Sequence, residues 1–405
     1  MKLTTACTRA SQLYRLGEQA AFEIVVSSES PIPPDLSVTV QLTSDTQALF
    51  LEKTAPAASA RPLRLEGTLP EPGFLRCRAT IQEGSETLMN ECAAAFEPER
   101  ILPVLPEPED FDAFWACALK RLDSIPEDVR CERAPELSTA EYDAFRVSFA
   151  AIEQSRVYGV LTVPTAKCGK PPFPAVFEVP SAGPSIRDPR EFAFTVTPRD
   201  YICFNVNVHA YDIAMDKEAC NAAYRELTGF LHGIQSPETY YFHRAAIGIH
   251  RAMKWLYERE DVDRSHFLYY GGSQGGFMGF NQVALAGGRF TAAMFHLPAM
   301  ADVGGSLVGR HPPPLHLPEM EQHMHTLSYF DPANFAKRIR CPTMMTVGFI
   351  DNACYPSSVY AAYNMLSCEK YMLNCIESGH CGMFSYKKHL AVMWAWMRTR
   401  MNRDF

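Results

Sequence analysis

The stretch Phe267-Leu268-Tyr269-Tyr270-Gly271-Gly272-Ser273-Gln274-Gly275-Gly276 decides the fold of this chain of 405 residues. Its four apolar residues predict a buried strand, and residues 277–286 after it predict a helix. A serine at such a turn, with glycines two positions before and after it, is typical of a nucleophile elbow, because the glycines let strand and helix backbones cross closely. The alternative is a glycine-rich loop that only joins a strand to a helix.

Candidate partners for Ser273 occur later in the chain. A serine hydroxyl needs a general base, and the base needs an acid that orients it. Asp351 follows the apolar run 344–350, and His380 follows a short strand at 373–376 and the loop Glu377-Ser378-Gly379. The order Ser, Asp, His is that of hydrolases built on this elbow. Asp351 could instead be a helix cap, and Glu377 is a weaker candidate acid because its short link to His380 constrains the geometry.

The rest of the chain divides into two parts. Residues 1–100 contain alternating strands at 20–26, 36–42 and 73–81, which predict a small all-β, immunoglobulin-like sandwich. Residues 101–110 are rich in proline and acid and predict a linker. From residue 111 to 405, strands alternate with helical stretches, which predicts an α/β domain with a doubly wound, mostly parallel sheet. The predicted strands are 157–163, 175–179 and 202–208, and the predicted helices are 111–122, 240–257 and 387–401.

Composition argues against several classes of function. The chain has 38 basic and 46 acidic residues, a net charge of −8, and 47% hydrophobic residues. An acidic chain without a basic stretch has no general attraction for nucleic acid or anionic lipid. The long uncharged run from Ser265 to Gly288 is broken by glycines and polar residues, so it is not a membrane span. We therefore expect neither a nucleic-acid partner nor a membrane.

Cysteine and histidine spacing argues against a disulfide framework and a metal site. The thirteen cysteines are scattered without a C-x-x-C pair, which indicates reduced thiols and a cytoplasmic protein. No apolar segment follows Lys2, so no secretory signal is expected unless one was trimmed. The histidine pairs His311 with His316, and His323 with His325, lack the spacing of a zinc site. We expect no metal.

From about Asp110 to Met401 the chain resembles the acetyl xylan esterase and cephalosporin C deacetylase family, carbohydrate esterase family 7. The matching segments are residues 271–276, 236–241, 326–331, 347–351 with 355–364, and Ser378-Gly379-His380. The resemblance implies an α/β-hydrolase fold, a catalytic triad of Ser273, Asp351 and His380, and no metal or organic cofactor. It also implies a possible homo-oligomer, and the N-terminal sandwich is an addition to the minimal family member.

Three segments depart from the family pattern. His209-Ala210-Tyr211 stands where the family carries Arg-Gly-Gln, Pro180-Ser181-Ala182 stands where it usually has His-Gly-Tyr, and Cys381 stands where a glutamate follows the histidine. An oxyanion hole uses backbone N–H groups, so Gln274 and Ala182 can still supply it. Loss of the tyrosine ring predicts a wider space around the acyl group.

Together these features predict a serine carboxylester hydrolase that removes small acyl groups, acetyl first, from sugar or other alcohol esters. The expected partner is a small-molecule or oligosaccharide acyl ester. Two alternatives remain at this point. One is a peptidase or amidase on the same fold, because the triad alone does not distinguish an ester from an amide. The other is a carbohydrate-binding protein with a degenerate hydrolase domain.

Overall fold

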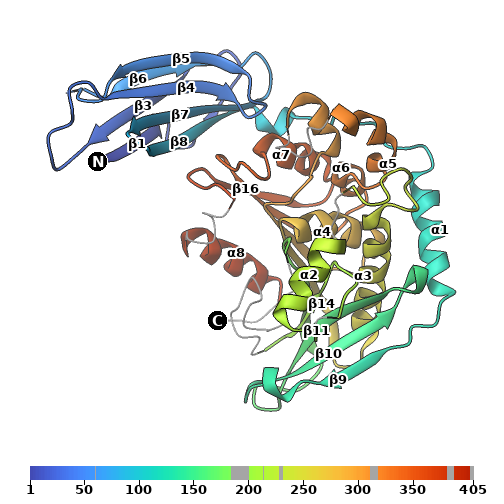
Figure 1. Cartoon of the computed structure of the whole chain (residues 1–405). Coiled ribbons are helices and arrows are strands. Elements are labelled where there is room, and N and C mark those ends of the chain that lie inside the picture. Colours follow the sequence, from blue (N-terminus) through green and yellow to red (C-terminus); the bar gives the residue numbers. More distant parts are fainter. Residues whose placement is uncertain are drawn as a thin grey trace.

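The computed structural model shows two lobes, an N-terminal β-sandwich and a larger α/β domain (Figure 1). It describes residues 1–59, 61–183, 200–212, 214–227, 231–310, 318–380 and 387–401. The sandwich lies beside α7, near the end of the large sheet at which β16 and β17 lie. Among the described helices, each is too short or too polar to cross a lipid bilayer.

The N-terminal lobe is built from two antiparallel sheets. One has the order β1-β3-β6, and the other has the order β2-β8-β7-β4-β5, in which only the short β2 pairs in parallel with β8. Along β4, Val38, Val40 and Leu42 alternate inward, as the period-two pattern predicts, and fill the space between the sheets. The strands are β1 (Lys2–Cys7), β2 (Leu13–Tyr14), β3 (Ala20–Ser27), β4 (Ser37–Ser44), β5 (Leu49–Pro56), β6 (Leu63–Gly67), β7 (Gly73–Glu83) and β8 (Glu86–Phe96).

The large domain is organised around one nine-stranded sheet with the order β17-β16-β15-β14-β12-β13-β11-β10-β9. Strands β17, β16, β15, β14, β12 and β13 pair in parallel. Strands β11, β10 and β9 form an antiparallel edge next to β13. The predicted α/β fold with a mostly parallel sheet is therefore confirmed. The strands are β9 (Arg130–Arg133), β10 (Tyr142–Ala150), β11 (Arg156–Pro164), β12 (Phe173–Val179), β13 (Ile202–Val206), β14 (Val262–Gly272), β15 (Ala292–His296), β16 (Thr343–Gly348) and β17 (Lys370–Cys375).

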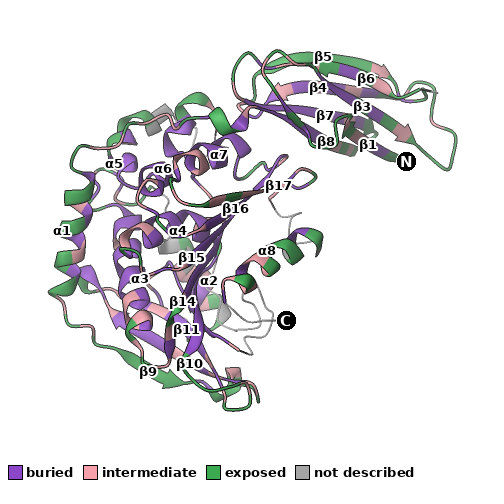
Figure 2. Cartoon of the chain, turned by 180° about the vertical axis from the view of Figure 1, so that it is seen from behind, coloured by how far each residue is buried: buried purple, intermediate pink, exposed green. Residues whose placement is uncertain are grey.

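Helices cover both faces of this sheet. Residues of α1, α3, α4, α6 and α7 share one large apolar core with the sheet, and Met393 and Met397 of α8 pack on the opposite face. Figure 2 shows the central strands buried between these layers, while β5 and β9 are exposed. The helices are α1 (Phe111–Asp123), α2 (Lys217–Leu227), α3 (Tyr241–Glu258), α4 (Gln274–Leu285), α5 (Met324–Ser328), α6 (Pro332–Ala336), α7 (Pro356–Met365) and α8 (Lys387–Thr399), with short 3₁₀ turns η1 (Pro98–Arg100), η2 (Pro135–Leu137), η3 (Ile152–Gln154), η5 (Val303–Val308) and η6 (Pro318–His323).

The segment between the two lobes is fixed to the large domain. The Asn364 side-chain amide on α7 donates hydrogen bonds to the carbonyl oxygens of Pro98, at 3.0 Å, and Ile101, at 2.8 Å. Glu107 forms ion pairs with Lys337, at 2.8 Å, and Arg338, at 2.7 Å. The predicted linker is thus a bonded connection rather than a free tether.

Apolar contacts also join the two lobes. Phe74 of β7 is fully buried, and its ring packs edge-on against Phe349, with ring centroids 5.1 Å apart. Phe74, Ala93 and Ala95 belong to the core of the large domain although they lie on sandwich strands. The outer face of the sandwich therefore shares an apolar core with the large domain. The contact with Phe349 lies in the segment that connects β16 to Asp351.

Candidate active site

Ser273 occupies a strained turn between β14 and α4. Its backbone has φ 51° and ψ −112°, and its N–H donates a hydrogen bond to the carbonyl oxygen of His296, at 2.8 Å. A positive φ at a residue with a side chain costs on the order of 1–3 kcal/mol and is typical of functional sites. Ser273 also directly precedes the first residue of α4, where unpaired backbone N–H groups gather. This is the geometry expected of a nucleophile elbow.

The glycines around Ser273 are required by close backbone contacts. A Cβ atom on Gly271 would lie 2.3 Å from the carbonyl oxygen of Gly275, and a Cβ on Gly275 would lie 1.9 Å from that of Val179. Both contacts are with backbone, which cannot rotate out of the way. The hydroxyl of Tyr269 donates to the Gly275 carbonyl, at 2.7 Å, and fixes the crossing further. The glycine-rich sequence therefore does more than join a strand to a helix.

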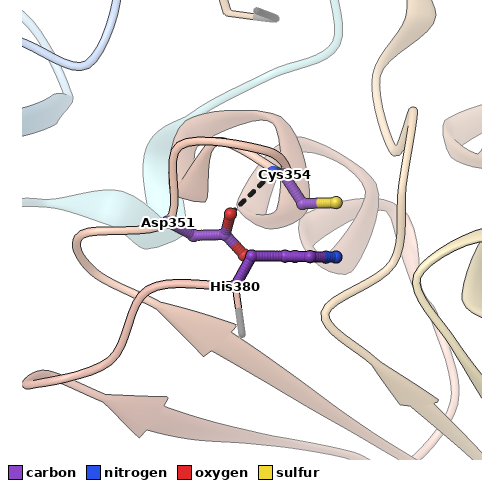
Figure 3. Close-up of side chains that lie close together, drawn as sticks. All are labelled: Asp351, Cys354 and His380. Atoms are coloured by element: carbon purple, nitrogen blue, oxygen red, sulfur yellow. Dashed lines mark hydrogen bonds and ion pairs between the residues drawn. The ribbon is translucent and has the colours of Figure 1, made fainter. Parts of the chain in front are cut away.

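The three predicted residues form a hydrogen-bonded chain. His380 Nε2 lies 3.1 Å from Ser273 Oγ, and His380 Nδ1 lies 2.9 Å from Asp351 Oδ2. Ser273, Asp351 and His380 follow β14, β16 and β17, whose carboxyl ends meet at one edge of the sheet. Figure 3 shows the Asp351 carboxylate and the His380 ring side by side. Glu377 instead pairs with Lys388, at 2.9 Å.

The Asp351 carboxylate is fully buried and satisfied by donors. Oδ1 accepts hydrogen bonds from the backbone N–H groups of Ala353 and Cys354, both at 2.8 Å, while Oδ2 faces His380. The two backbone bonds fix the carboxylate against rotation, so that Oδ2 stays directed at the imidazole. Asp351 is therefore more than a helix cap.

Asp351 controls the charge of His380. Burial by itself would lower the pKa of His380, but the hydrogen bond to Asp351 and its negative charge outweigh this, so that the pKa is raised above its ordinary value. His296 lies nearby and is fully buried, with Nδ1 2.9 Å from Thr346 Oγ1. Burial, together with the charge of His380, lowers the pKa of His296 to about 3. His296 is thus neutral at neutral pH, and His380 is the basic group of the site.

Sequence reasoning missed Cys354, whose buried thiol lies close to Asp351 and His380 (Figure 3). Ligand atoms of Asp351, Cys354 and His380 all lie within 4.8 Å of one another, a spacing that could hold a cation. However, burial and the charge of Asp351 raise the pKa of this thiol well above its ordinary value, and a hydrogen bond with Ser273 opposes this only in part. A protonated thiol is a poor metal ligand. The one feature of the sequence that could have indicated Cys354 is its position three residues after Asp351.

The two predicted oxyanion donors lie on neighbouring elements. Gln274 is the first residue of α4, and Ala182 is exposed three residues beyond the end of β12. The hydroxyl of Ser181, the residue before Ala182, donates a hydrogen bond to the carbonyl oxygen of Gly272, at 3.1 Å. This bond connects the loop after β12 to the nucleophile elbow. Helix N-terminus and loop together present the type of backbone site that stabilises an oxyanion.

The remaining predicted positions lie elsewhere. His209 is buried beside the large sheet, where it bonds the Tyr241 hydroxyl and stacks with Tyr211. His323 ends η6, and His325 is exposed on α5. Cys381, His311 and His316 lie outside the described residues.

Comparisons with known proteins agree with this geometry. The family model described as acetyl xylan esterase (AXE1) matches residues 99–303 and 314–398. A curated relative, acetyl esterase Axe7A from Xylanibacter ruminicola, is 28% identical over 380 residues, which cover 90% of this chain and 84% of the relative.

Solved structures show the same fold. An acetyl xylan esterase from Paenibacillus sp. R4 matches with a TM-score of 0.65 and 23% identity, over 75% of this chain and 98% of the other. Acetyl xylan esterase 1 from Thermoanaerobacterium sp. JW/SL YS485 matches with a TM-score of 0.58 and 19% identity, over the same shares of the two chains. Since the family model spans most of the chain, including the elbow of Ser273 and the positions of Asp351 and His380, the chain belongs to the acetyl xylan esterase family and is a carboxylic ester hydrolase.

Proposed function

We propose that this protein removes small acyl groups, acetyl first, from sugar hydroxyls through an acyl-enzyme on Ser273. The observation that carries the proposal is the hydrogen-bonded chain from Ser273 through His380 to the buried Asp351. The name of the relative from Xylanibacter ruminicola, an acetyl esterase, supports acetate as the first acyl group to test.

In the proposed acylation step, Ser273 Oγ attacks the acyl carbonyl carbon while His380 Nε2 accepts the hydroxyl proton. Asp351 stabilises the imidazolium that forms, and the N–H groups of Gln274 and Ala182 bind the oxyanion. The bond between the acyl carbon and the alcohol oxygen then breaks, and His380 returns the proton to the leaving alcohol. A water molecule, deprotonated by His380, releases the acid and restores Ser273.

The loop after β12 bears on acyl selectivity. Ser181 and Ala182 are small and exposed, where the resemblance would place a tyrosine. A small side chain leaves more room beside the acyl carbonyl than an aromatic ring does. We expect acetyl esters to react fastest, with a shallower decline toward longer chains than a tyrosine at this position would give.

The test is hydrolysis of 4-nitrophenyl acetate, butyrate and octanoate by wild type and by Ser273→Ala, beside acetate release from acetylated xylan. The expected result is a wild-type rate that falls from acetate to octanoate and a loss of at least about 10⁴-fold in the variant. Release of amine from a peptide amide, without acetate release, would instead favour the peptidase. Saccharide binding without hydrolysis of any ester would favour the binding protein.

A further inference from the structure

An arginine of the N-terminal sandwich contacts the backbone of the proposed catalytic acid. Arg76 lies on β7 and is 4% exposed. Its Nη2 donates a hydrogen bond to the carbonyl oxygen of Asp351, at 2.6 Å, and its Nη1 donates to the side-chain oxygen of Asn352. One guanidinium therefore holds two consecutive residues of the loop that carries the acid.

The guanidinium is itself held in place. Glu91 on β8 lies 3.5 Å from Arg76 Nη1, and the carboxylate is almost fully buried. The Arg76 guanidinium also lies 5.2 Å from the ring centroid of Tyr355. A planar, multiply bonded guanidinium is a rigid support, because its donors are fixed in one fork.

Further bonds from the sandwich reach the same loop and the start of α7. The Asp45 carboxylate accepts a hydrogen bond from the backbone N–H of Ser357, at 3.0 Å, and the Gln47 side-chain amide donates to the Tyr355 hydroxyl, at 2.7 Å. Together with the bonds from Arg76 to Asp351 and Asn352, these contacts hold residues on both sides of the Ala353 and Cys354 N–H groups, which themselves hold the Asp351 carboxylate.

We propose that Arg76 is a positioning residue for the reaction, which holds the Asp351 backbone so that its carboxylate stays aligned with His380. The sandwich thereby supports the active site of the large domain. Arg76 itself lies outside the segment matched by the family model, which begins at residue 99. This inference rests on the proposed function of the triad. Its physical reason is that a displacement of about 1 Å in a catalytic group can cost 10²-fold in rate.

The first test is Arg76→Lys, which keeps the positive charge but loses the fork. We expect kcat for 4-nitrophenyl acetate to fall about 10- to 100-fold, with KM within about twofold of wild type, since ground-state binding is untouched. The matched control is Arg78→Lys on the same strand, whose guanidinium bonds Glu91, at 3.4 Å, and which should keep the wild-type kcat. An unchanged kcat in a folded Arg76→Lys would overturn the inference.

A double-mutant cycle separates positioning from a general structural role. If Arg76 acts through Asp351, then Arg76→Lys should have little further effect on kcat/KM in an Asp351→Asn background. Equal effects of Arg76→Lys in both backgrounds would show that it acts on the rate by another route. Thermal unfolding of each variant confirms that the assays use folded protein.

A second variant covers the case in which Arg76→Lys does not fold. Asn352 is exposed and accepts only the second bond of the fork, so Asn352→Ala should fold and lower kcat by about two- to tenfold. Wild-type kcat in Asn352→Ala, with Arg76→Lys unfolded, would make Arg76 a structural residue only. Absence of Ser273-dependent hydrolysis in the wild type would contradict the proposed function itself, a result distinct from either outcome.

Discussion

The hydrogen bond between His380 and Asp351 sets the pH range in which the site can work. His380 must be neutral to accept the Ser273 proton, and Asp351 raises the His380 pKa above its ordinary value of about 6.5. Among the described residues near it are the neutral His296 and the protonated thiol of Cys354. Protonation of His380 should therefore switch the reaction off at a higher pH than for a free histidine.

We predict that kcat/KM for 4-nitrophenyl acetate rises with pH and levels off above the raised pKa of His380, which places the acid limb above about 6.5. In Asp351→Asn the carboxylate charge is lost while burial remains, so the limb should move to lower pH. A pH–rate profile of both proteins measures this. A wild-type limb well below 6.5, or one that Asp351→Asn leaves in place, would contradict the assigned roles.

Sequence patterns at single residues predicted the positions of Ser273, Asp351 and His380 at one sheet edge, because carboxyl ends of parallel strands meet there. They did not predict Cys354, which reaches the site only because the loop after Asp351 turns its next N–H groups back to the carboxylate. A turn of this kind depends on backbone geometry and leaves no periodic pattern in the sequence.

The elements themselves were predictable where their periodicity was strong. The expected helix at 111–122 is α1, and the expected strand at 175–179 lies within β12. The helix after Ser273 was expected from Phe277 but begins at Gln274. Two glycines in its first turn have low helix propensity, and the close contact with β12 and β14 overrides that preference. Strand β10 was not predicted, because Asp143 and Arg146 interrupt its apolar residues.

A buried arginine of α3 supports the end of α1. Arg251 is 3% exposed and donates to the carbonyl oxygens of Ala150, at 2.6 Å, Ile125, at 2.8 Å, and Pro126, at 3.3 Å, and also to that of Leu122. The Leu122 carbonyl belongs to the last turn of α1, where helix carbonyls lack partners within the helix. One side chain thus satisfies backbone groups of three segments.

We predict that Arg251→Met lowers the free energy of unfolding by about 2–3 kcal/mol, since the four carbonyl oxygens lose the hydrogen bonds that the guanidinium donates. Urea denaturation measures the change, and kcat should stay near wild type because α1 lies away from the site. The control is Lys254→Met on the same helix, which breaks a surface ion pair with Asp123 and should cost at most about 1 kcal/mol. Equal costs in the two variants would contradict the capping role.

At the scale of the whole molecule, the sequence did not predict how the sandwich packs against the large domain. The bond between Arg76 and Asp351 joins residues 275 positions apart. Nothing in the local pattern of β7 indicates that Arg76 reaches Asp351, because Arg78 lies two positions further along the strand and pairs with the same Glu91. The cytoplasmic location and the homo-oligomer stay predictions.

We predict that both lobes unfold in a single calorimetric transition, because Phe74 and Ala95 belong to the core of the large domain. Phe74→Ala should lower the stability by about 3–5 kcal/mol and move that transition as a whole. The control is Phe50→Ala on the edge strand β5, where the side chain is 46% exposed and should cost about 0.5 kcal/mol or less. Two separate transitions in the wild type would show that the lobes are independent.

The most direct test of the central claim is the identity of the residue that forms the covalent intermediate. A serine-directed phosphonate should modify the wild type once, and peptide mapping by mass spectrometry should place the adduct on Ser273. Loss of the base in His380→Ala should slow this labelling by orders of magnitude, because the hydroxyl is then no longer activated. An adduct on another residue, or no adduct in a protein that hydrolyses 4-nitrophenyl acetate, would contradict the account.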